Sequence, residues 1–253
     1  MHLRRFVLLF LFASLSLLLS GCIYLRLLEV KHQLYTFDGY VKIRNHDGLS
    51  LIFLKPVLFK EDLLFLARRY PTKIEESHRG THWQYLFLKQ QGNSEKKRGD
   101  FDLPVNLIFQ NNKLITAIFP ARFYEILPEP FIIAALRALG RSEINIKDRF
   151  AYGAFHDKDT QGQIQIPGKQ DVLRLLGRPS EEEHKGNLLV LTYRYRLEPG
   201  EPDVKKSPAL GWARFTFPST SDNLLKAEAR FAMVRLSMDF RNGARMTIAQ
   251  QPH

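Results

Sequence analysis

Few residues of this chain have the type and spacing that chemistry requires. His78 and His82 are four residues apart, which on a helix would offer two imidazoles to a metal ion, but Gly80 between them favours a loop. The run His156-Asp157-Lys158-Asp159 could supply a base or a cation ligand, yet it lacks the acidic ladder of a calcium-binding loop. The run Glu181-Glu182-Glu183 is typical of a solvated segment. We interpret all three as surface segments and predict no metal site.

Catalytic signatures are also missing from the sequence. It contains neither the Gly-x-Ser-x-Gly turn of serine hydrolases nor a glycine-rich phosphate-binding loop. An enzyme would therefore need residues that only folding brings together. The prediction is a non-enzymatic protein with no catalytic residue.

The remaining reactive group is the thiol of Cys22, the single cysteine of the chain. One cysteine excludes an internal disulfide and a multi-cysteine zinc site. The small residues Ser20 and Gly21 precede it, so an extended chain could enter a peptidase groove at this point. A thiol in that position can be acylated.

The segment before Cys22 is typical of an export signal. Arg4 and Arg5 precede an apolar run over residues 6–19, about 14 residues, whereas a transmembrane helix needs about 20. The sequence Leu19-Ser20-Gly21-Cys22 resembles the lipobox of bacterial lipoproteins, whose signal is cut before a cysteine that carries diacylglycerol on its sulfur. The resemblance implies lipidation at Cys22 and no other cofactor. The alternative is an uncleaved anchor followed by a buried cysteine.

The compartment and the charge narrow the choice of partners. Ile23, rather than Asp, follows the cysteine, which by the sorting rule of such lipoproteins implies the periplasmic side of the outer membrane. The net charge is +11, and export makes nucleic acid a poor candidate. Basic residues that could bind an anionic head group or an acidic partner, or serve solubility alone, form three groups: Lys96, Lys97 and Arg98; Arg137 and Arg141; Lys205 and Lys206.

One order of elements occurs twice along the chain. Lys60-Glu61-Asp62 and Lys169-Gln170-Asp171 each open an amphipathic helix that ends at proline or glycine. An alternating strand follows in each copy and includes Tyr85 in the first and Tyr193 in the second. A polar loop and two further alternating strands complete each copy. Between the copies, a helix with one apolar stripe is expected to end at Gly140.

Turns near the two ends of the chain are also predicted. Residues 40–43 and 49–54 are expected to form a strand pair. Apolar side chains of the last strands alternate at odd-numbered positions up to Phe231 and at even-numbered positions from Val234 on. One extra residue near Ala232 would restore the same face, which predicts a β-bulge there. A three-residue turn over residues 241–243 would pair Met238 with Met246.

The second copy contains Leu176-Gly177-Arg178-Pro179 followed by the Tyr193 strand, and it resembles the BamE/SmpA/OmlA type of small outer-membrane lipoprotein. That family has a helical front and a three-stranded antiparallel sheet, and the same fold occurs in tandem in the β-lactamase-inhibitor protein group. The resemblance implies a role as an accessory of outer-membrane β-barrel assembly. The motif itself is structural, because Gly177 permits a positive φ and Pro179 stops the helix.

The predicted fold class is therefore α+β: a tandem repeat of a helix plus a three-stranded antiparallel sheet, joined by a connector helix. The expected segments are a lipoprotein signal at 1–21, a lipidated tether at 22–38, repeats at 39–124 and 161–253, and a connector helix and loop at 125–160. The tether is expected to form a short amphipathic helix along the membrane or the body.

The predicted function is that of an outer-membrane lipoprotein that binds a periplasmic or outer-membrane protein partner as a scaffold in envelope assembly. Two alternatives stay open. One is a binding module for an anionic envelope component, namely lipopolysaccharide, phospholipid or peptidoglycan. The other is a tandem-repeat inhibitor of an envelope enzyme.

Overall fold

A computed structural model describes residues 23–46, 48–90, 99, 101–126, 129–141, 143–145, 150–154, 167–203, 209–231, 234–239 and 245–250. Its helices are α2 (Ile23–Thr36), α3 (Lys60–Ala67), α4 (Ala121–Ile126), α5 (Glu129–Arg141) and α6 (Lys169–Leu176). Its strands are β1 (Val41–Asn45), β2 (Leu49–Phe53), β3 (Lys73–Ser77), β4 (Gly80–Gln90), β5 (Leu103–Gln110), β6 (Lys113–Phe119), β7 (Glu143–Asn145), β8 (Phe150–Ala154), β9 (Glu181–Lys185), β10 (Leu188–Leu197), β11 (Leu210–Pro218), β12 (Lys226–Phe231), β13 (Val234–Asp239) and β14 (Arg245–Gln250).

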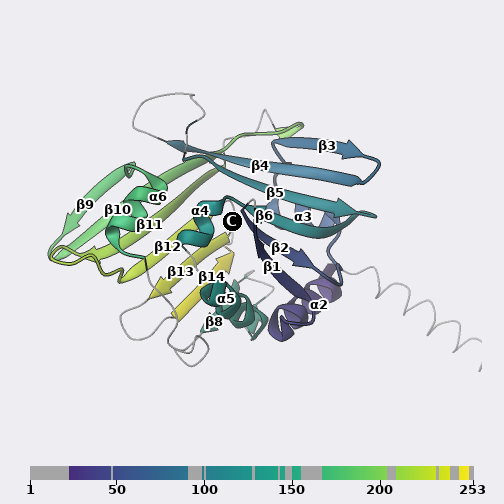
Figure 1. The fold of residues 1–253 in the computed structure, drawn as a ribbon, viewed down its shortest axis with the longest axis horizontal. Helices are drawn as coiled ribbons and strands as arrows, with labels where there is room; N and C mark the ends of the chain where they lie inside the picture. Colours follow the sequence, from purple (N-terminus) through teal and green to yellow (C-terminus); the bar gives the residue numbers. More distant parts are fainter. Residues whose placement is uncertain are drawn as a thin grey trace, which may run out of the picture.

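These strands form one continuous antiparallel sheet in the order β1-β2-β6-β5-β4-β10-β11-β12-β13-β14-β8-β7, with β3 paired to β4 and β9 paired to β10. Figure 1 shows that the sheet is curled, so that β1 near one end and β8 near the other both lie toward α2 and α5. Helix α5 contacts both α2 and β8. The two helices therefore lie between the two ends of the sheet.

The predicted fold class is wrong, because the protein is mostly β and is not built from helix-plus-three-strand repeats. Strand β10 pairs with β4, so the strands of both halves of the chain join one sheet. Helix α3 is followed by four strands, β3 to β6, and helix α6 is followed by six, β9 to β14. All five residues of β3 and of β9 are exposed, so neither strand has the apolar alternation from which a buried strand is predicted.

The first half, α3 to β6, and the second half, α6 to β12, begin in the same way. Asp62, in the first turn of α3, accepts a hydrogen bond on Oδ2 from the backbone N–H of Phe59 at 2.9 Å. Asp171, in the first turn of α6, accepts the same bond from Gly168 at 3.1 Å. A carboxylate at this position satisfies a backbone donor and interacts favourably with the helix dipole.

Further hydrogen bonds of the two halves also correspond. The hydroxyl of Tyr85 donates to the carbonyl of Arg69 at 3.0 Å, and that of Tyr193 donates to the carbonyl of Gly177 at 3.1 Å. Burial raises the pKa of both tyrosines. Each tyrosine thereby fixes the C-terminal end of the helix in its own half to the central strand.

The junction between the halves is symmetric. Thr72 Oγ1 donates to the carbonyl of Glu198 at 2.6 Å, and Ser180 Oγ donates to the carbonyl of Gln90 at 2.6 Å. The same two hydroxyls accept backbone N–H groups on their own central strands, at 3.1 and 3.0 Å. The pairing of β4 with β10 is thus reinforced from both sides by equivalent residues.

Two buried clusters line the curled sheet, one mainly from each half. Trp83, Tyr85 and Phe109 belong to the first, while Tyr193 and Phe217 belong to the second. Phe87 on β4 packs against both clusters. The hydrophobic core is therefore continuous across the junction, as the sheet is.

Three local predictions have clear outcomes. The strand pair at 40–54 is confirmed, because β1 pairs with β2. The register of the last hairpin is also confirmed, because Met238 pairs with Met246. The β-bulge near Ala232 is wrong: Phe231 pairs with Val234, so β12 and β13 are separate strands of a hairpin. Side chains of directly paired residues lie on the same face of a sheet. A two-residue turn therefore shifts the buried positions from odd to even residue numbers, just as a bulge would.

Candidate functional site

The strongest candidate surface lies at the beginning of the described chain. Helix α2 begins at Ile23, the residue that follows Cys22 in the sequence, and it packs against α5. Cys22 lies outside the described residues, so its lipidation stays a prediction. The contacts of α2 decide whether an anchor at Cys22 would hold the body loosely or firmly.

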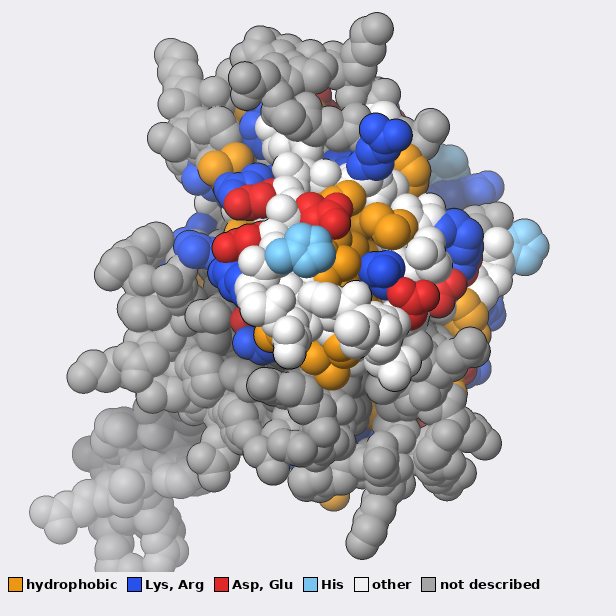
Figure 2. Space-filling view, turned by 90° about the vertical axis from the view of Figure 1, so that its left-hand side faces the viewer, with side chains coloured by type: hydrophobic (Ala, Val, Ile, Leu, Met, Phe, Trp, Pro, Cys, Tyr) orange, Lys and Arg blue, Asp and Glu red, His pale blue; other side chains and the backbone are white. Residues whose placement is uncertain are grey.

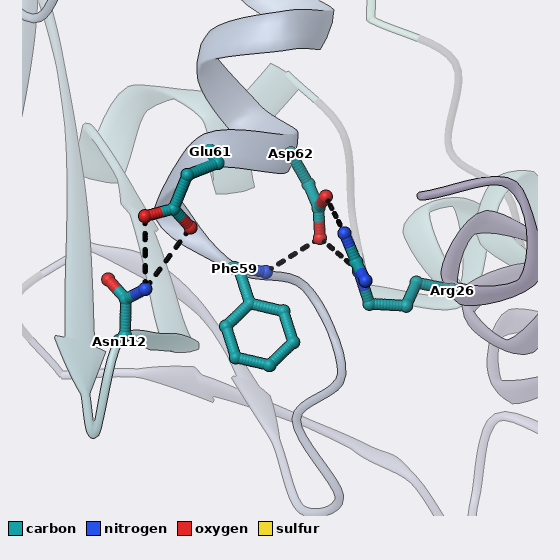
Figure 3. A network of polar contacts seen from close by, with 5 residues as sticks. All are labelled: Arg26, Phe59, Glu61, Asp62 and Asn112. Carbon is teal, nitrogen blue, oxygen red and sulfur yellow. Dashed lines mark hydrogen bonds and ion pairs between the residues drawn. The ribbon is translucent and has the colours of Figure 1, made fainter. Parts of the chain in front are cut away.

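A buried ion pair connects α2 to the first half (Figure 3). Arg26 Nε donates to Asp62 Oδ2 at 2.7 Å, and Arg26 Nη2 donates to Oδ1 at 2.5 Å. Asp62 is 1% exposed, and its Oδ2 also accepts a hydrogen bond from the backbone N–H of Phe59. The guanidinium lies 5.0 Å above the ring of Phe59. A bidentate ion pair of this kind fixes both the position of α2 and its rotation about the helix axis.

The other side of the same helix turn is held to the turn between β5 and β6. Both carboxylate oxygens of Glu61 lie 3.1 Å from Nδ2 of Asn112. Asn112 adopts a left-handed backbone conformation with φ of 65°, which asparagine tolerates better than most residues. The start of α3 is therefore connected on one side to α2 and on the other to the sheet.

Helices α2 and α5 approach each other very closely at Gly140. A Cβ atom on Gly140 would lie 2.2 Å from the backbone nitrogen of Tyr35. The predicted helix end at Gly140 is wrong, because α5 continues through Arg141. Gly140 is required by helix packing rather than by a left-handed cap, since any side chain would push α2 away.

The structure places the predicted basic residues Arg137 and Arg141 at this helix pair. Arg137 Nη2 donates to Asp38 Oδ2 at 2.7 Å, and the guanidinium of Arg141 lies 5.7 Å from the ring centre of Tyr35. Both arginines therefore contact α2 or the turn that follows it, which the sequence did not indicate. Lys96, Lys97, Arg98, Lys205 and Lys206 lie outside the described residues, so anion binding by those loops stays a prediction.

The outward face of α2 exposes four large hydrophobic side chains together with His32. Tyr24, Leu25, Leu28 and Tyr35 are between 38% and 52% exposed. Spacings of three, four and seven residues place them on one side of the helix. Gln33, on the opposite side, is buried and donates to the carbonyl of Lys55 at 3.0 Å. Helix α2 thus has one face fixed to the body and one largely exposed face that Arg141 borders at Tyr35.

The histidine and glutamate candidates lie on exposed hairpins. His78 and His82 are on the β3–β4 hairpin rather than on a helix, and His82 Nδ1 is 3.4 Å from Glu75 Oε2. Glu181 on β9 pairs with Arg194 at 2.6 Å, and this contact lowers the pKa of Glu181. In the described part of the chain no three potential metal ligands come together. The run at 156–159 lies outside the described residues.

Figure 2 shows the end of the molecule formed by β9 and β10. Acidic, basic and histidine side chains are interspersed there with hydrophobic ones. The ion pairs of Glu181 with Arg194 and of Glu183 with Lys185 belong to these strands. A surface of alternating charge sign is suited to specific side-chain contacts with a protein more than to a polyanion.

Sequence reasoning missed Lys89, which lies at the junction of the halves. Its ammonium donates to the carbonyl of Leu176, at the end of α6, and to that of Arg178 at 2.6 Å. It also lies 4.8 Å from the ring centre of Phe101 and 5.2 Å from that of Tyr193. Burial lowers the pKa of Lys89 to about 8. Because the lysine of one half caps the helix of the other, no local pattern could have indicated it.

Comparison of the chain with protein-family models, with characterised proteins and with solved structures finds no match. Among the helices that the structure describes, none is both long and apolar enough to cross a bilayer.

Proposed function

We propose that this chain is a non-enzymatic lipoprotein of the outer membrane that acts as a protein-binding scaffold on the periplasmic side, within envelope or β-barrel assembly. Lipid on Cys22 provides the anchor. The observation that supports this best is helix α2, which begins at the next residue and is fixed to the body by Arg26 and Asp62. An anchor at Cys22 therefore has no flexible linker and holds the β body at a defined position on the membrane.

The exposed hairpins supply the partner surface. Strands β3 and β9 occupy equivalent places in the two halves, and every residue of both is exposed. Charged side chains on these strands disfavour addition of a further strand, so the partner is bound through side chains. Ile74 on β3 is 45% exposed and gives the first hairpin an apolar contact point.

The anchor is tested by replacing Cys22 with alanine in the full chain. Without the thiol no lipid can be attached, so we expect an uncleaved precursor in the inner-membrane fraction. The matched control is Ser20→Ala, which keeps a small residue before the cysteine and should leave sorting unchanged. Normal levels of the Cys22→Ala chain in the outer membrane would show that lipid does not direct its location.

The scaffold role is tested by photo-crosslinking in intact cells. A photoreactive residue at position 74 on β3 or 184 on β9 should give a discrete adduct with one envelope protein. The same residue in place of Asn223, which is exposed in the segment between β11 and β12, is the control. Equal or absent adducts at all three positions would contradict binding through the hairpins.

A further inference from the structure

We infer that the outward face of α2 lies in the head-group region of the bilayer, so that this helix is a second membrane contact beside the lipid. The inference deepens the proposed function and rests on its anchor at Cys22. This surface, here called the α2 face, exposes His32 and four large hydrophobic side chains: Tyr24, Leu25, Leu28 and Tyr35.

The distance between the anchor and the face supports a lipid occupant. A helix rises about 1.5 Å per residue, so Leu28 lies only about 9 Å along the axis from position 22. Tyr24 and Leu25 are closer still. With acyl chains attached at position 22, the first two turns of α2 stay within about 9 Å of the membrane surface. The ion pair of Arg26 with Asp62 keeps these turns on the body, so α2 and the body approach the membrane together.

The composition of the α2 face also matches a membrane interface. Tyrosine is enriched at the head-group level, where its ring is buried and its hydroxyl stays hydrated, and leucine reaches the acyl boundary. Arg141 borders the face beside Tyr35, which is suited to lipid phosphate. The one acid of α2, Glu29, is exposed at the edge of this face and accepts a hydrogen bond at 3.1 Å from the buried Gln33.

The consequence is a fixed orientation of the β body. An acyl anchor alone lets a domain rotate freely, whereas a helix that also lies in the interface leaves rotation only about the membrane normal. The hairpins β3–β4 and β9–β10 would then face the periplasm at a constant height. A partner in the same membrane would meet them with less loss of orientational freedom.

The test uses the full lipidated chain in vesicles of phosphatidylethanolamine and phosphatidylglycerol that contain doxyl-labelled lipid. Leu28→Cys introduces a thiol for an environment-sensitive fluorophore on the α2 face. The matched control is Leu210→Cys, an exposed leucine on β11, which lies well away from α2 (Figure 1). We expect the doxyl lipid to reduce fluorescence at position 28 by about twofold or more and to leave position 210 nearly unchanged.

Two outcomes would overturn the inference. Equal quenching at positions 28 and 210 would mean that α2 does not face lipid. Protection of position 28 from soluble iodide in native membranes, without quenching by doxyl lipid in vesicles, would mean that a protein covers the face. The wild-type chain is the control for the anchor. It should take up no fluorophore, because its only cysteine is lipidated. Labelling at Cys22 would contradict the proposed function and would leave the α2 face untouched as the cause.

Discussion

Replacing Arg26 with alanine should release α2 from the body. The change leaves the carboxylate of Asp62 buried and without its cation, while the bond from Phe59 remains. Removing one partner of a buried ion pair costs about 3–5 kcal/mol. Because the Arg26 side chain is 20% exposed and water can reach the vacated position, we expect a smaller cost than this range, about 2 kcal/mol. In an equilibrium constant that is about 30-fold.

The assay is hydrogen exchange of the α2 amides in the full lipidated chain, followed by mass spectrometry. Exchange through local opening reports the free energy that holds an element to the body, so α2 amides should exchange about 30-fold faster in Arg26→Ala. The matched control is Arg174→Ala. Arg174 pairs with Glu125 at 2.8 Å in an exposed position, where an ion pair adds little stability. Exchange in α2 should not change in this control.

A second substitution, Asp62→Asn, tests whether the buried charge of Asp62 causes the loss of stability. If the cost arises from an uncompensated buried charge, adding Asp62→Asn to Arg26→Ala should restore part of the lost protection, because the amide is neutral and still accepts from Phe59. Unchanged α2 exchange in Arg26→Ala would refute the role of the ion pair. Purely additive loss in the double variant would refute the explanation by buried charge.

Three further predictions concern packing and the junction. Gly140→Ala should cost about 1–3 kcal/mol and speed exchange in α2, because the new methyl would overlap the backbone of Tyr35. Thr72→Val and Ser180→Ala should each lower the free energy of unfolding in urea by about 1–2 kcal/mol and by similar amounts, since each removes an equivalent pair of hydrogen bonds; a large difference would contradict the symmetric junction. Lys89 has a folded pKa of about 8 against an ordinary value of 10.5, so its contribution to stability is full above the unfolded pKa and declines as the pH falls through about 8. The stability of the wild type relative to Lys89→Met should therefore be greater at pH 9.5 than at pH 7 in urea titrations, and the opposite trend would contradict burial as the cause.

Local patterns predict the elements of this protein better than their partners. The alternation around Tyr85 and Tyr193 indicates inward positions of two related strands, and both side chains are buried. The pairing of β4 with β10 has no such signal, because period-two alternation states which face is buried and not which strand lies alongside. The fold class fails for that reason: two sets of strands that look separate in sequence share one sheet.

The same limit applies at the β12–β13 hairpin. A change of inward parity between Phe231 and Val234 is compatible with a bulge or with a chain reversal. Only the pairing of these two residues distinguishes the alternatives.

The candidate surface depends on contacts between distant residues. Arg26 and Asp62 are 36 positions apart, and neither has a local pattern that suggests the other. Arg137 and Arg141 are recognisable as a basic pair, but their neighbours Asp38 and Tyr35 belong to another helix and its following turn. Helix α2 is apolar on both sides, so its sequence alone could not separate the face that packs on the body from the face that is exposed.

The most direct test of the proposed anchor is the mass of the N-terminal peptide of the chain isolated from outer membranes. The proposal predicts a mature chain that begins at Cys22 and carries diacylglycerol on the sulfur. A chain that begins at Met1, or one in which the Cys22 thiol is free, would contradict it.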